Sequence, residues 1–215
     1  YANFNPVHTA SYWLDRWIWG KTYVGLRVTQ LALYAACVVA FASLARRLAL
    51  RPAGVAVAAL LFAWHPAHVE NAAWLSARKD LLFLLFLVLG LNTWLGPRPW
   101  PLAAPGAPTP SASRRLAATG LFTLAIGAKS TAIVVVPLLL ILALARRRLR
   151  TDLPWIAALL PVVVLSAVMT YQAQDAFGAV AAPTPWGERL IRTGRALGWY
   201  VGQAVLPLTL VPRPT

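Results

Sequence analysis

The sequence predicts an all-α, multi-pass integral membrane protein, and three observations lead to that prediction. Hydrophobic residues make up 59% of the 215 residues and charged residues only 12%, whereas soluble domains carry about 25% charged residues. The hydrophobic residues form long runs, and about 20 of them in succession cross a bilayer. Basic residues gather in short clusters between the runs, as in cytoplasmic loops of membrane proteins. The chain has room for roughly five to seven membrane segments.

The formal net charge of +14 comes in part from the same clusters. A nucleic-acid-binding protein carries its basic residues on one face that contacts phosphates, but here the arginines follow apolar runs. The clusters are Arg46-Arg47, Arg114-Arg115 and Arg146-Arg147-Arg148 with Arg150. We therefore expect them to mark the cytoplasmic side and to attract anionic lipid, and we expect no nucleic-acid partner. The single cysteine, Cys37, excludes an intramolecular disulfide.

We interpret the 215 residues as one membrane domain. Its predicted parts are an external loop over residues 1–25, membrane helices with their connections over 26–206, and an external tail over 207–215. In the external loop, residues 7–19 predict an amphipathic helix on the outer membrane surface, since its tryptophans favour the headgroup layer. An ordinary packed loop helix is the alternative. Asp15 and Arg16 lie between the apolar residues of this helix.

The predicted membrane helices cover residues 26–45, 54–64, 81–95, 116–128, 131–145 and 153–171. The second is stopped by His65-Pro66, because proline breaks the helical ladder, and the third continues a helix that begins near Glu70. Lys129-Ser130 marks a turn between the fourth and fifth. Thr151 or Asp152 is available as cap of the sixth. Residues 96–113 have the composition of a flexible inner loop, and residues 172–182 that of an external loop.

Thr184-Pro185 predicts the start of one more helix, with Thr as N-cap and Pro at the first helical position. The helix ends before Pro207. Crossing, re-entry and an interfacial position all remain open for it.

The densest group of chemically active side chains follows the second membrane helix. It comprises His65, His68, Glu70, Arg78 and Asp80. Ionisable residues in membrane segments are costly, so a functional role is the default hypothesis. Two histidines and a carboxylate could hold a divalent metal, although the spacing favours hydrogen-bonding roles. In the structural alternative, His65-Pro66 only stops a helix and Arg78 pairs with Asp80 at the membrane rim.

Four further cations are predicted to lie on the outer side: Lys129, Arg189, Arg192 and Arg195. Lys129 is either a snorkelling anchor or a phosphate ligand. The three arginines recur every third residue and share one broad helix face. Because they run against the positive-inside tendency, we expect an anionic partner, either a bound phosphate or bulk anionic headgroups.

One family resemblance adds to this interpretation. The string from His65 through Trp74 to Leu82 resembles the H-P-x-H-x-E-x-x-x-W-x-x-x-R-x-D-L-L signature of transmembrane and tetratricopeptide-repeat O-mannosyltransferases and their bacterial relatives. Asn5-Pro6 before the surface helix is similar to their first external loop. Ala128-Lys129-Ser130 resembles their A/S-K-E segment, with Ser130 in place of Glu. Residues 189–207 resemble their last conserved block.

The resemblance implies a type C glycosyltransferase fold in the bacterial cytoplasmic (inner) membrane, with its active face periplasmic or extracellular. It further implies sugar transfer from a polyprenyl-phosphate donor to a hydroxyl of a protein or glycan acceptor. Donor phosphate would then contact Lys129, Arg189, Arg192 and Arg195, while the His65 to Asp80 group shapes the cavity. An acidic pair that supplies the base is expected before Tyr1, and tetratricopeptide repeats after Thr215. No cofactor is expected, and the catalytic base is assigned to no residue of this chain.

Two other function classes remain open at this point. One is a non-catalytic membrane scaffold that keeps the fold. The other is a transporter, motivated by ionisable residues near the membrane.

Overall fold

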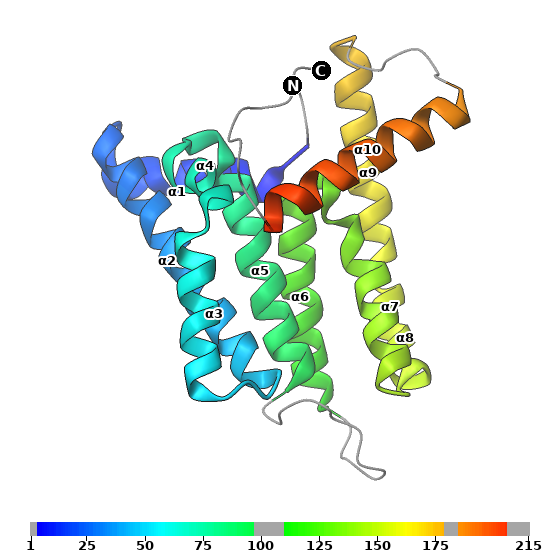
Figure 1. Cartoon of the computed structure of the whole chain (residues 1–215). Helices are drawn as coiled ribbons and strands as arrows, with labels where there is room; N and C mark the ends of the chain where they lie inside the picture. The colour runs from blue at the N-terminus through cyan, green and yellow to red at the C-terminus, as the bar shows by residue number, and fades with distance from the viewer. Residues whose placement is uncertain (1–3, 97–109, 179–184, 206–215) are drawn as a thin grey trace.

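The computed structural model describes residues 4–96, 110–178 and 185–205. All regular secondary structure within these residues is helical, as the sequence predicts. Most helices lie alongside one another, whereas α1 (Pro6–Trp19) and α10 (Trp186–Val205) run across the direction of the others near one end (Figure 1). We call this end the α1 end. The opposite end, where α2 (Tyr23–Arg47) and α7 (Val135–Ala145) finish next to arginines, is called the basic end.

Two helices of the described chain are long and apolar enough to cross a membrane. One is α2, and the other is the stretch Leu149–Ala176, which comprises α8 (Leu149–Ala157) and α9 (Leu160–Ala176). A third span results if α3 (Pro52–Trp64) is joined with Pro66–Ala73, to which it is bent by 53°. These helices support the predicted membrane location. Large apolar side chains project outward from them, among them Val39, Leu61 and Val164, which are 67%, 66% and 58% exposed.

The centre of the bundle is the pair α5 (Arg78–Leu95) and α6 (Ala112–Ala128), which pack along most of their length. The closest approach is at Gly90 of α5. A methyl group there would lie 2.5 Å from Cε1 of Phe122 on α6, so only glycine fits. Phe122 and Trp94 belong to a buried apolar cluster that also includes Leu139 of α7 and Ile156 of α8. This cluster joins α5 and α6 to α7, α8 and α9.

Three interruptions of the helices lie toward the α1 end. α3 stops at His65, before η1 (Pro66–His68) and α4 (Val69–Ala73), and α6 stops at Lys129, before η3 (Ser130–Val134). Both breaks are predicted by the sequence. The expected continuous helix from Glu70 to Leu95 is wrong, because the backbone is extended at Trp74 (φ −103°, ψ 117°) and η2 (Leu75–Ala77) intervenes. No proline or glycine marks this break.

Three other expectations concern boundaries. The cap assigned to Thr151 or Asp152 is wrong, because α8 already begins at Leu149 and Asp152 is a buried residue inside it. The external loop begins later than predicted, since α9 extends to Ala176. The predicted inner loop, the N-cap Thr184 and the tail 207–215 fall wholly or largely outside the described residues.

Candidate functional site

The surface helix α1 presents two different faces. Trp13, Trp17 and Ile18 are 72%, 84% and 51% exposed, in agreement with the predicted apolar side. His8, Tyr12 and Asp15 follow one another at intervals of four and three residues, which places them on a common face. This second face meets the bundle, since α1 packs against α2, α5 and α6. Asp15 is the most deeply buried residue of the helix, at 2% exposed.

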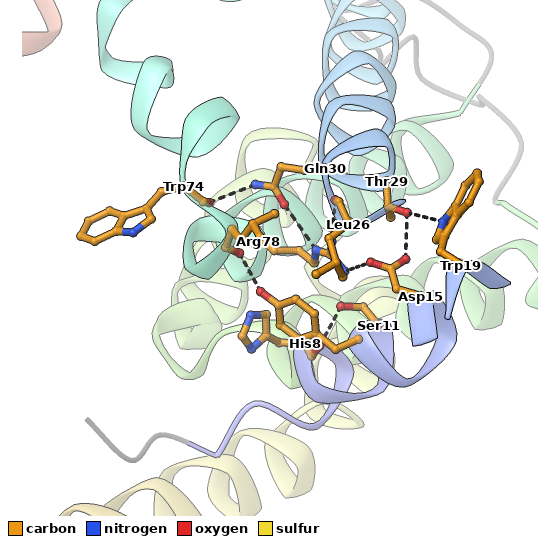
Figure 2. Close-up of polar contacts among 11 residues, drawn as sticks. His8, Ser11, Asp15, Trp19, Leu26, Thr29, Gln30, Trp74 and Arg78 are labelled. Carbon is orange, nitrogen blue, oxygen red and sulfur yellow. Dashed lines mark hydrogen bonds and ion pairs between the residues drawn. The ribbon is translucent and has the colours of Figure 1, made fainter. Parts of the chain in front are cut away.

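Arg78, at the start of α5, contacts this buried face of α1 (Figure 2). Its Nη1 donates to Oδ2 of Asp15 over 2.5 Å, and both side chains are almost fully buried. Its Nη2 donates to the carbonyl of Leu26, and its Nε donates to Oε1 of Gln30. Its guanidinium also lies 4.4 Å from the ring centroid of Tyr12. Every nitrogen of the guanidinium is therefore bonded, and the charge is paired inside the protein.

The partners of Arg78 are themselves fixed. Thr29 donates to the second carboxylate oxygen of Asp15 over 2.8 Å and accepts from Trp19 over 3.1 Å. Gln30 donates to the carbonyl of Trp74, at the break before α5. We call these residues, Tyr12, Asp15, Thr29, Gln30 and Arg78, the Arg78 network. It ties α1 to α2 and α5, and its Asp15 and Arg78 side chains are buried from solvent.

The pairing of Arg78 with Asp80, which the structural alternative predicts, is wrong. Asp80 turns to the other side of the helix start and forms an ion pair with Lys129, at the break between α6 and η3. Both side chains remain partly accessible, with 27% and 32% exposed. Next to this pair, the backbone N–H of Ser130 donates to Oδ1 of Asn5 over 3.2 Å. Lys129 is therefore held in position rather than loose at a hairpin tip.

His8 lies close to members of both groups, Tyr12 and Asp80. Its ring packs edge-on against Tyr12 at a centroid distance of 5.0 Å. Burial, reinforced by the positive charges of Lys79 and Arg78, lowers the pKa of His8 below its usual value of 6.5. Its Nε2 is buried and has no hydrogen-bond partner among the described residues. The imidazole is therefore neutral at pH 7.

His65 and His68 lie at the corner between α3 and α4. Their ring centroids are 6.1 Å apart, and the ring of His68 also packs against Phe62 and Tyr34. His65 Nδ1 accepts from the backbone N–H of Ala67, which caps the short turn. Glu70, in contrast, is exposed.

The structure does not bring the five residues predicted to shape a cavity together in one place. The ring of His68 packs against those of Phe62 and His65, Arg78 pairs with Asp15, Asp80 pairs with Lys129, and Glu70 is exposed. Among the residues that the structure describes, no three His, Cys, Asp or Glu side chains lie close enough to hold a metal ion. The arrangement instead offers a partly exposed ammonium beside a carboxylate.

The three arginines of α10 are exposed. Arg192 pairs with Glu188 one turn earlier at 3.0 Å, and Arg189 lies 5.3 Å from the ring of Trp186. On the opposite side of the helix, Leu190 and Val201 are 70% and 62% exposed. An exposed apolar face opposite a basic one is typical of an interfacial helix. The structure does not bring these arginines into contact with Lys129.

Sequence reasoning missed four of the five residues of the Arg78 network. Asp15 is assigned only as a polar residue of the amphipathic helix, and Tyr12, Thr29 and Gln30 are not singled out. The spacing of His8, Tyr12 and Asp15 on the side away from the tryptophans is a signal that could have identified the buried face. Comparison of the chain with protein-family models, with curated proteins and with solved structures found no match.

Proposed function

We propose that this chain is the membrane portion of a glycosyltransferase that moves a sugar from a polyprenyl-phosphate donor to a hydroxyl of a protein or glycan. In this proposal the fold is of the type C glycosyltransferase class. The α1 end faces the periplasm or the exterior of a bacterial inner membrane.

One observation carries the proposal, namely that residues of three separate motif segments lie in contact. Asn5, of the segment before the surface helix, accepts a hydrogen bond from Ser130 of the Ala128 to Ser130 segment. Lys129 of the same segment pairs with Asp80 of the His65 to Leu82 string. Arg78 of that string pairs with Asp15 in the surface helix that Asn5-Pro6 begins. Segments that serve one site are expected to meet in this way.

The chemistry needs a cation where the leaving group departs. The acceptor oxygen attacks the anomeric carbon, the bond from that carbon to the phosphate oxygen breaks, and the hydroxyl proton passes to a base. Polyprenyl phosphate leaves with the bonding electrons, so a positive group beside it lowers the barrier. Lys129 is the cation best placed for this task, because Asp80 orients it while about a third of its side chain stays exposed. The α10 arginines add positive charge at the same end.

A transfer assay tests the proposal. The full-length protein is reconstituted in vesicles with labelled polyprenyl-phosphate hexoses, and transfer to acceptor is measured. Lys129→Met and Asp80→Asn are each expected to reduce turnover by about 100-fold, the scale for one lost transition-state contact. Matched controls are Lys21→Met and Asp175→Asn, both exposed, which should retain turnover. Unchanged turnover in both site variants would refute the assignment.

A non-catalytic scaffold is the second candidate. It is favoured by the closed character of the Arg78 network, in which the charged groups satisfy one another. No transfer by wild-type protein from any of the labelled donors, with protein folded, would favour the scaffold over the enzyme.

A further inference from the structure

The basic end holds a second buried charge cluster, which the proposed function does not use. Arg115 on α6 and Asp152 on α8 form an ion pair whose side chains are 4% and 0% exposed. The guanidinium of Arg115 also lies over the ring of Trp94 on α5, with 3.8 Å between Cζ and the ring centroid. This pair fixes α8 against the central helices.

Arg146, directly after α7, lies beside this pair and is 4% exposed. Its Nε and Nη1 are buried and have no hydrogen-bond partner within the described parts of the chain. The same is true of Nη1 of Arg115 and Oδ2 of Asp152. A buried polar group without a partner costs about 1–3 kcal/mol, and more if it is charged. Three buried guanidinium nitrogens in this cluster therefore donate no hydrogen bond, beside one carboxylate oxygen that accepts none.

The surroundings increase the positive charge further. Arg148 and Arg114 are close enough to repel Arg146, and Arg47 is close enough to repel Arg114. Among the described residues that interact electrostatically in this cluster, Asp152 is the single carboxylate. It stands among five arginines: Arg47, Arg114, Arg115, Arg146 and Arg148. Like charges that gather around one acid are destabilising unless an anion joins them.

We propose that Arg115, Arg146 and Arg148 bind one phosphate group at the basic end, between α6, α7 and α8. Phosphate offers several acceptor oxygens and matches the fork of a guanidinium. It is also the anion found at the ends of membrane helices, where basic pockets bind lipid headgroups. Nε and Nη1 of Arg146 donate no hydrogen bond among the described residues. A rotamer change that turns these two nitrogens toward a phosphate therefore breaks no hydrogen bond of theirs. The phosphate comes either from an anionic phospholipid or from free inorganic phosphate.

The test uses the full-length protein purified in mild detergent. Short-chain phosphatidylglycerol, diacylglycerol of equal chain length and inorganic phosphate are titrated separately at constant ionic strength. Binding is followed by the melting temperature and by native mass spectrometry. Arg146→Gln is expected to weaken phosphatidylglycerol binding about tenfold, which corresponds to about 1.4 kcal/mol. The matched control is Arg150→Gln, since Arg150 is an exposed arginine of α8 at the same end, and it should bind like wild type.

The arms distinguish the source of the phosphate. Stabilisation by phosphatidylglycerol alone assigns a lipid headgroup, and stabilisation by inorganic phosphate as well assigns the free anion. No stabilisation of wild type by either phosphate ligand overturns the proposal. Equal weakening in Arg146→Gln and Arg150→Gln also overturns it, because that result indicates general surface charge. If Arg146→Gln does not fold, Arg146→Lys decides, since it keeps the charge but loses the fork and should still bind more weakly than wild type.

Discussion

The two ends of the bundle each bury an arginine paired with an aspartate, yet the two pairs differ in how completely they are satisfied. Around Arg78, all three guanidinium nitrogens have acceptors and the ring of Tyr12 covers the group. Around Arg115, one nitrogen and one carboxylate oxygen have no partner, and Arg146 adds two more unpartnered nitrogens. A satisfied network is suited to hold helices together, whereas an unsatisfied one is suited to receive a ligand.

The two buried clusters are also proposed to play different roles, one in positioning helices and one in binding a ligand. The Arg78 network fixes the start of α5, and Asp80, which pairs with Lys129, belongs to the same first turn. In our account the network positions the proposed reaction site without touching substrate. The cluster at the basic end would itself be the binding site. Four changes test this difference, from the largest expected effect to the smallest.

Arg78→Leu should have the largest effect on stability. It leaves the carboxylate of Asp15 buried without its charge partner, which costs about 3–5 kcal/mol. The free energy of unfolding in mixed micelles measures the loss. The double variant Arg78→Leu with Asp15→Leu should recover part of it, because no lone charge then remains buried. A single variant as stable as wild type would contradict the structural role of the network.

Gly90→Leu should destabilise both ends together, because α5 carries Arg78 at one end and Trp94 near the other. A side chain at residue 90 would collide with Phe122, and overpacking of this kind costs about 1–3 kcal/mol. The melting temperature of the variant should fall accordingly. Gly120→Leu is the control, since a Cβ at Gly120 on α6 meets nothing within 4 Å. Equal melting temperatures for the two variants would contradict the close packing of α5 on α6.

Arg146→Leu should cost less than about 1 kcal/mol of folding free energy without added phosphate ligand, in contrast to Arg78→Leu. In the folded protein the buried Nε and Nη1 of Arg146 have no acceptor among the described residues, whereas water solvates them in the unfolded chain, so the folded state loses little when they are removed. The unfolding titration used for Arg78 measures it directly. A loss as large as that of Arg78→Leu would show that the two clusters serve the same structural purpose.

His8→Gln should change only the acid side of the stability curve. The pKa of His8 is lowered in the folded protein, so the unfolded chain takes up this proton first as pH falls. Stability attributable to His8 is unaffected above its usual value of 6.5 and declines below it. Between about pH 7.5 and pH 5.5 the melting temperature of the variant should therefore fall less than that of wild type. Parallel curves would refute the assignment.

The helices and most of their breaks could be predicted because their signals are local. Proline after His65 and the polar pair Lys129-Ser130 between apolar runs mark two breaks that the structure contains. The break at Trp74 could not be predicted from such signals, since the hydrogen bond from Gln30 to its carbonyl comes from another helix.

The ion pairs formed by Asp15, Asp80 and Asp152 could not be predicted, because each joins distant parts of the chain. Asp15 and Arg78 are 63 residues apart, Asp80 and Lys129 are 49, and Arg115 and Asp152 are 37. The structural alternative pairs Arg78 with Asp80, the nearest acid in the sequence, whereas the partner of Arg78 is Asp15. Which acid an arginine meets depends on helix packing, which is set by contacts such as Gly90 with Phe122.

Accessibility labelling tests the central claim, that the α1 end and the basic end lie on opposite sides of the membrane with the α1 end outside. In a Cys37→Ala background, Glu70→Cys and Arg147→Cys place single thiols at exposed positions near the two ends. A membrane-impermeant maleimide applied to intact spheroplasts should label the first and should label the second only after lysis. Labelling of both thiols in intact spheroplasts, or of the second alone, would contradict the account.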